Sequence, residues 1–157
     1  MQGSAAVVAC LENLLRGELM ARDQYFIHSR RYNDLGLHKL YERLDHEMQE
    51  ETAHADVLIR RILFLDGEPD MRPLPFTSGK TVEEMLRKDL ATEYDVRQHL
   101  QDAIALCERE RDFVTRDLLL PQLKDTEEDH AHWLEQQLGL IEQMGLQNYV
   151  QMKAAIA

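Results

Sequence analysis

Two Glu-x-x-His pairs stand out in the chain, Glu51 with His54 and Glu127 with His130. Residues three apart lie on the same face of a helix, so each pair can place one carboxylate and one imidazole beside a single metal ion. Such pairs arise easily by chance in a chain this rich in acidic residues, and the motif alone is weak evidence. Its value depends on what stands at matching positions elsewhere.

Two further glutamates repeat the spacing of these pairs. Glu18 precedes Glu51 by 33 residues, and Glu93 precedes Glu127 by 34 residues. Each half of the chain therefore carries a single glutamate and, about one helical hairpin later, a Glu-x-x-His pair. Four-helix bundles with dinuclear carboxylate sites have this arrangement, because two helices supply one Glu each and the other two supply Glu-x-x-His.

Buried carboxylates at these four positions would repel one another unless cations neutralised them. Two divalent ions balance the four negative charges. Oxygen-rich coordination with one imidazole per ion suits Fe²⁺ or Mn²⁺ better than structural Zn²⁺, which prefers Cys and His. The sequence thus predicts a dinuclear metal centre with six ligands: Glu18, Glu51, His54, Glu93, Glu127 and His130.

The elements that must position these ligands are predicted by apolar residues that recur at three- and four-residue steps. Leu, Glu, Arg, Gln and Ala dominate, as is typical of helices. Four long helices are expected, at residues 4–34, 37–65, 82–110 and 113–143. Each has an apolar stripe that the predicted ligands interrupt, and in the last helix this stripe comprises Leu120, Leu123, Glu127, His130, Leu134 and Leu138.

The connections predict an all-α four-helix bundle with one long crossover. Short breaks at 33–36 and 111–112 make antiparallel hairpins, whereas the segment 66–80, with three of the four prolines, is long enough to cross the bundle. Gly145 precedes a short fifth helix from Leu146 to about Ala155. Pro121 is expected to kink the fourth helix without breaking it.

Length, charge and cysteine content limit the class of protein. The 157 residues, 44% of them hydrophobic, fit a single domain over 1–157. A net charge of −11 argues against nucleic acid or an anionic membrane as partner and favours cations. The longest apolar run, 5–11, is too short to span a membrane. Cys10 and Cys107 are predicted to be buried free thiols, which fits a cytoplasmic protein.

Longer motifs surround the predicted ligands: Gln24-Tyr25-Phe26, EETAHAD around Glu51, RRILFLDGEP at 60–69, EEDHAHWLE at 127–135 and GLQNYVQ at 145–151. With them the chain resembles the bacterial ferritins and bacterioferritins over essentially its whole length. The resemblance implies a ferritin-like bundle, a hollow cage of 24 subunits and a ferroxidase centre in each subunit. It also implies the same six ligands, with Tyr25 beside them.

Other polar residues have weaker signals. One set, close before Glu51, is either a secondary iron site on the inner surface or an ordinary solvated face: His46, Glu47 and Glu50. Another set is a candidate lining for an entry pore between subunits, as in the relatives: Asp66, His132, Asn148 and Gln151.

The remaining histidines have no acidic partner at ligand spacing and are expected on the surface: His28, His38 and His99. Trp133 and Met85 fall at helical spacings that favour packing in the core.

Bacterioferritins typically bind haem between two subunits through one Met from each, at the position after the second-helix Glu. Here that position is Thr52, whose hydroxyl cannot replace a thioether as a haem ligand. One residue along a helix is a turn of ~100°, so Thr52 is expected to point away from the centre. We therefore expect the homo-oligomer to be haem-free. Met48, one turn earlier, either packs in the seam between subunits or ligates haem in a mixed cage with a Met-bearing subunit.

The favoured function is iron storage, with a ferroxidase centre that oxidises Fe²⁺ to Fe³⁺ by O₂ or H₂O₂ and passes iron to a mineral inside the cage. The main alternative is a small oligomer with an Fe or Mn centre that does not store iron, such as a peroxide scavenger. A purely structural helical bundle is the third possibility, and it predicts no iron oxidation.

Overall fold

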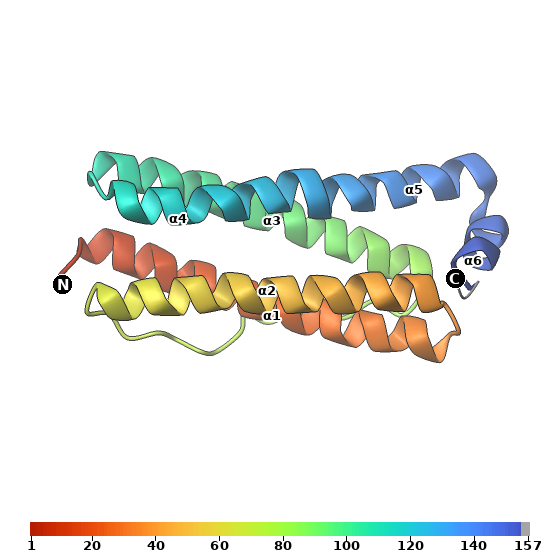
Figure 1. The fold of residues 1–157 in the computed structure, drawn as a ribbon. Helices are drawn as coiled ribbons and strands as arrows, with labels where there is room; N and C mark the ends of the chain where they lie inside the picture. Colours follow the sequence, from red (N-terminus) through yellow and green to blue (C-terminus); the bar gives the residue numbers. More distant parts are fainter. Residues whose placement is uncertain (155–157) are drawn as a thin grey trace.

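The computed structural model describes residues 1–154, and no strand occurs in that range. Three long helices, α1 (Ala5–Asp34), α2 (His38–Phe64) and α3 (Val82–Arg109), lie alongside a fourth rod (Figure 1). That rod comprises α4 (Phe113–Lys124), the π-helical segment η1 (Asp125–Ala131) and α5 (His132–Met144). The short α6 (Leu146–Ala154) folds back at one end of the bundle. The predicted all-α fold is confirmed, while the predicted end at Ala155 lies outside the described residues.

Local sequence signals set the ends of these helices. The side chains of Ser4, Thr81 and Asp112 accept hydrogen bonds from the backbone N–H three residues later, at 3.4, 3.3 and 3.0 Å. Gly36 and Gly145 have φ values of +79° and +82°, which a residue without a Cβ adopts at little cost. The short breaks predicted at these places therefore have a direct physical cause.

The crossover between α2 and α3 runs beside α1 from one end of the bundle to the other (Figure 1). The amide of Leu74 donates to the carbonyl of Arg16 at 3.1 Å, and Nε of Arg16 donates to the carbonyl of Arg72 at 2.8 Å. Near its end, the amide of Gly79 donates to Nε2 of His28 at 2.9 Å. These bonds attach the crossover to α1.

His28 is fully buried, so its predicted surface position is wrong. Its Nε2 accepts from Gly79, and therefore Nδ1 carries the proton that it shares with Asp89 Oδ1 at 2.8 Å. Gln24 donates to the same Asp89 oxygen at 2.8 Å. The partners of His28 come from the crossover and from α3, 51 and 61 residues away. His38 is partly buried, and His99 is exposed as expected.

Two apolar clusters fill the bundle, one toward each end. The first includes Leu11, Leu15, Leu58 and Leu100, and the second is built from a different stretch of each rod. Met85 is fully buried in the second cluster and Trp133 packs against it, as predicted. The residues predicted as ligands lie near the middle of each rod, where one cluster gives way to the other, although Leu19 of the first cluster follows Glu18.

The two thiols match the expectation of burial only in part. Cys107 is buried and Cys10 is half-buried, and both are free. Within residues 1–154, no helix has the length and the apolar character that crossing a membrane requires.

The fourth rod departs from its predicted apolar stripe. Leu120 is 38% exposed, and the neighbouring Leu119 is buried in its place. The rod's buried positions include Leu119, Gln122, Thr126, His130 and Leu134. The three four-residue steps from Gln122 to Leu134 match the wide turn of η1, because a π-helix bonds residue i to residue i+5. Pro121 does not interrupt α4, and the departure from α-helical geometry begins at Asp125.

Candidate metal centre

Five of the six predicted ligands meet at mid-bundle, and all are at most 8% exposed: Glu18 from α1, Glu51 and His54 from α2, Glu93 from α3 and His130 from η1. They form two groups in which the ligand atoms lie within 4.8 Å of one another. Glu18, Glu51 and His54 make the first group, and Glu51, Glu93 and His130 make the second. Glu51 belongs to both.

The two carboxylate oxygens of Glu51 face different imidazoles. Oε1 lies 3.1 Å from Nδ1 of His130, and Oε2 lies 3.5 Å from Nδ1 of His54. The two rings stack with centroids 6.1 Å apart. A carboxylate placed in this way could serve two metal positions at once.

Each imidazole also has a terminal carboxylate on its Nδ1 side. Glu18 Oε2 lies 3.8 Å from Nδ1 of His54, and Glu93 Oε1 lies 3.3 Å from Nδ1 of His130. Two similar sets of oxygen and nitrogen ligands therefore share Glu51. Ligands of this type suit divalent first-row metals such as Fe²⁺ and Mn²⁺.

Outer carboxylates hold the far nitrogen of both rings. Nε2 of His54 lies 3.1 Å from Asp125 Oδ2, and Nε2 of His130 lies 2.5 Å from Glu47 Oε2 and 2.6 Å from Glu50 Oε2. A carboxylate on one ring nitrogen keeps a proton there and leaves the other nitrogen free to bind a metal. The outer acids therefore direct both Nδ1 atoms to the centre.

Protons partly compensate the negative charge of the metal-free centre. Burial raises the pKa of Glu93 to about 7, so this carboxyl binds a proton near neutral pH. Burial disfavours the charged form of His130, but hydrogen bonds to Glu47, Glu51 and Glu93 raise the pKa of His130 well above its ordinary value. Cations that enter the centre must replace these protons.

Several buried atoms of the centre lack a hydrogen-bond partner among the described residues: Glu18 Oε2, Glu51 Oε2, His54 Nδ1 and Glu93 Oε2. Such atoms are rare in folded proteins because each costs desolvation energy with no bond in return. Three of them face one another, because Glu18 Oε2 and Glu51 Oε2 lie 3.8 and 3.5 Å from Nδ1 of His54. Divalent cations at the centre would satisfy them.

Tyr25 lies beside the centre, where the resemblance places it. Its side chain is fully buried, its hydroxyl donates to Glu93 Oε1, and its ring meets the His130 ring edge-on with centroids 6.4 Å apart. Burial, together with the charge of Glu93, raises the pKa of Tyr25 well above its ordinary value. Tyr25 therefore stays protonated and keeps a hydrogen bond on Glu93.

Glu127, the sixth predicted ligand, does not reach the cluster. Its carboxylate is 39% exposed, and its Oε1 accepts a hydrogen bond from Nε of Arg97 at 2.9 Å. The prediction assumed α-helical spacing, with Glu127 and His130 on one face. In the wider turn of η1 the inward position before His130 is Thr126, which is fully buried.

A second acidic cluster adjoins His130 on its Nε2 side. Atoms of Glu47, Glu50, Asp129 and His130 lie within 4.8 Å of one another. Glu47 and Glu50 were predicted for a secondary iron site, and exposed His46 joins them through Glu50 at 2.9 Å. Asp129 was missed. Its position next to His130 in the sequence was the available signal, but α-helical spacing directs it away from Glu47.

Comparisons with known proteins agree with this geometry. A family model of the ferritin-like domain matches residues 8–144. The chain belongs to the bacterial ferritin family. Family members named bacterial ferritin from Synechocystis and from Pseudomonas aeruginosa are each 64% identical over 96% of this chain, covering 97% and 98% of their own lengths. A bacterioferritin from Brucella melitensis is 38% identical over 100% of this chain and 98% of its own.

The pore residues inferred from the family resemblance do not come together within one bacterial ferritin chain. Asp66 follows α2 at one end of the bundle and pairs with the terminal amino group at 3.3 Å. The other three lie on α5 and α6 and are exposed: His132, Asn148 and Gln151. Pores between subunits remain a prediction for these residues.

Thr52, at the position predicted for the haem-ligating Met of bacterioferritins, is exposed on α2, and its hydroxyl donates to the carbonyl of Met48 at 3.0 Å. Met48 is partly buried and packs against the apolar cluster of its own chain. Thr52 thus points away from the centre, as the sequence predicted.

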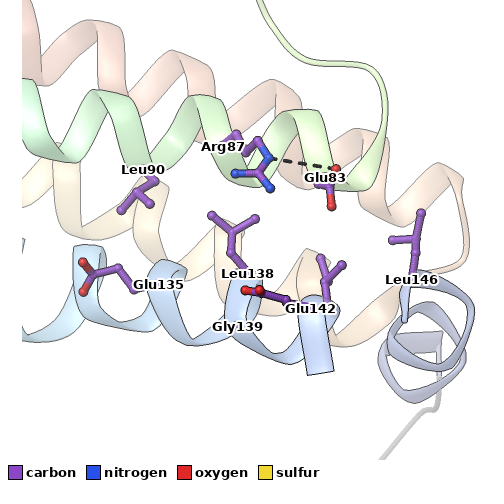
Figure 2. A pocket seen from close by; sticks show the side chains of 9 residues that line it. Glu83, Arg87, Leu90, Glu135, Leu138, Gly139, Glu142 and Leu146 are labelled. Carbon is purple, nitrogen blue, oxygen red and sulfur yellow. Dashed lines mark ion pairs between the residues drawn. The ribbon is translucent and has the colours of Figure 1, made fainter. Parts of the chain in front are cut away.

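A groove of about 570 Å³ lies between α3 and α5 near α6. Figure 2 shows Glu83 and Arg87 on its α3 side and Glu135, Leu138 and Glu142 on its α5 side. No histidine and no ligand of the centre lines it. The groove therefore contributes nothing to the metal chemistry described above.

Proposed function

We propose that the protein stores iron and that this centre is a ferroxidase site, where two Fe²⁺ ions are oxidised to Fe³⁺. The observation that carries the proposal is the shared Glu51, whose two oxygens face His54 and His130. Buried polar atoms without a hydrogen-bond partner, such as those around Glu51, destabilise a fold. A bundle with a purely structural role would not be expected to keep them. The membership of the bacterial ferritin family supports the same function.

In this proposal Glu18 and His54 hold one Fe²⁺, Glu93 and His130 hold the other, and Glu51 joins them. Tyr25 orients Glu93, while Asp125 and Glu47 orient the two imidazoles. Each Fe²⁺ gives up one electron. The two electrons and two protons reduce O₂ to H₂O₂, or H₂O₂ to two molecules of water.

The acidic cluster next to His130 offers a path for the Fe³⁺ product. Glu47 and Glu50 contact Nε2 of the same imidazole whose Nδ1 faces the centre. His46 and Asp129 extend this set of ligands. We propose a secondary iron site here, on the way from the centre to the mineral.

Exposed apolar side chains support assembly into a cage. Phe26, Phe64, Phe113 and Val114 are each 47–60% exposed in the isolated chain, and exposed apolar side chains that gather into a patch mark contacts with other proteins. We propose a homo-oligomer of 24 chains. At 18.3 kDa per chain, the expected mass of this oligomer is about 440 kDa, which size-exclusion chromatography with light scattering would test. A dimer would exclude storage and favour the small-oligomer alternative.

Aerobic oxidation of Fe²⁺ tests the ferroxidase proposal. The protein should oxidise Fe²⁺ well above the rate of buffer, and Glu93→Ala should return the rate to that of buffer. Asp95→Ala is the matched control, because Asp95 is an exposed acid on the same helix two residues away. A wild-type rate equal to that of buffer would contradict the proposal.

A further inference from the structure

Glu127 and Arg97 form an ion pair at the edge of the centre. Nε of Arg97 lies 2.9 Å from Oε1 of Glu127, and the side chains are 47% and 39% exposed. Within residues 1–154, neither side chain has another ion-pair partner at this distance. Glu127 occupies the family's ligand position in the sequence but lies outside both ligand groups.

The position of Arg97 explains how it reaches this carboxylate. Arg97 follows Glu93 by four residues on α3, so the two side chains lie on the same face of that helix one turn apart. The side chain of Arg97 therefore starts one helical turn from Glu93, a member of the second ligand group. It supplies a positive charge to Glu127 from the side facing solvent, while the unpartnered Oε2 of Glu93 stays inside.

We propose that Arg97 is a positioning residue that holds Glu127 outside the centre in the metal-free protein and yields it to the second metal ion. This inference rests on the proposed function. The guanidinium and the ion compete for one carboxylate, and a divalent ion attracts it more strongly than a single positive charge does. Because the Arg97–Glu127 pair is exposed, it is weak enough to be displaced.

Unequal binding at the two metal positions is the consequence. The first group, Glu18, Glu51 and His54, is assembled and buried before any ion arrives. The second group lacks Glu127 until Arg97 releases it. The apparent affinity of the second position is reduced by the fraction of molecules in which Glu127 is held outward.

Anaerobic titration with Co²⁺, which does not turn over with the oxidant, separates the two positions by calorimetry and by the absorption of the bound ion. Arg97→Ala should tighten the second ion by about two- to five-fold, the range set by an exposed ion pair, and leave the first ion unchanged. Arg87→Ala is the matched control, since Arg87 lies on the same helix and pairs with Glu83 at 3.9 Å (Figure 2). It should bind both ions as wild type does.

A double-mutant cycle shows whether the effect passes through Glu127. In a Glu127→Gln background, Arg97→Ala should no longer tighten the second ion, because no charged carboxylate remains to be released. Tightening that persists there would show a general charge effect and overturn the inference. Two Co²⁺ ions per chain with no effect of Arg97→Ala would also overturn it while leaving the proposed centre intact. Fewer than two ions in the wild type would contradict both.

Discussion

Oδ2 of Asp125 lies 3.1 Å from Nε2 of His54, on the opposite side of the ring from Nδ1, which faces Glu18 and Glu51. Burial lowers the pKa of His54, but the carboxylates of Glu51 and Asp125 outweigh this effect and raise the pKa above its ordinary value. Asp125 therefore keeps the proton on Nε2 and presents Nδ1 to a metal ion.

Removal of Asp125 should weaken the first metal position. We expect Asp125→Ala to lower its affinity for a divalent ion by about tenfold, at the weak end of such outer-carboxylate effects, because Asp125 is half exposed. Anaerobic calorimetry measures this change. Glu128→Ala, which removes an exposed acid three residues away, is the control and should match the wild type. An affinity unchanged by Asp125→Ala would show that His54 needs no such partner.

The metal-free protein should lose stability as pH rises through neutrality. The pKa of Glu93 is raised from 4.5 to about 7, so its contribution to folding is fully present below pH 4.5 and is lost as pH rises through 7. That loss is at most about 3 kcal/mol, and Glu93→Gln should abolish it. Thermal unfolding of the wild type and of Glu93→Gln from pH 5 to 8 measures this loss of stability. The infrared band of the protonated carboxyl reports the protonation of Glu93 directly. Parallel pH profiles would contradict the assignment.

The buried hydrogen bonds of His28 should contribute far more to the free energy of unfolding than a surface histidine does. His28→Ala removes the partner of Asp89 and of the Gly79 amide, leaving buried polar groups unsatisfied. The free energy of unfolding should fall by about 2–4 kcal/mol, because one or two buried polar groups would lose their hydrogen-bond partner. Chemical denaturation measures it, and exposed His99→Ala should stay within about 0.5 kcal/mol. Equal effects of the two changes would rule out this role of the hydrogen bonds.

Haem binding should depend on residue 52. We expect the purified homo-oligomer to show no stoichiometric Soret band, and Thr52→Met to gain one, because the exposed position faces away from the centre and a thioether ligates haem iron. Thr52→Leu controls for apolar character without a sulfur. A stoichiometric Soret band in the unaltered protein that Met48→Ala removes would instead identify Met48 as the ligand.

The helices and most of the centre could be predicted because their signals are local. Helix ends differ from the expected ones by one residue or so, since capping side chains and turn glycines act over three or four positions. Glu18, Glu51, His54, Glu93 and His130 could be placed together because each interrupts an apolar stripe at the middle of its helix.

Other features depend on contacts between residues far apart in the chain, which the local spacing of residues cannot predict. The side chain of His28 is buried by partners from α3 and the crossover, and Asp125 reaches His54 across 71 residues. Glu127 pairs with Arg97 at the edge of the centre, and the wide turn of the π-helical segment places Thr126 at the inward position. A pattern read at 3.6 residues per turn cannot show that change.

Anaerobic titration of the metal-free protein with Fe²⁺ tests the central claim most directly. The shared position of Glu51 predicts two ions per chain in the wild type and the loss of paired binding in Glu51→Ala, because both metal positions use this carboxylate. A wild type that binds one ion or none, or a Glu51→Ala variant that still binds two, would contradict a dinuclear centre at this site.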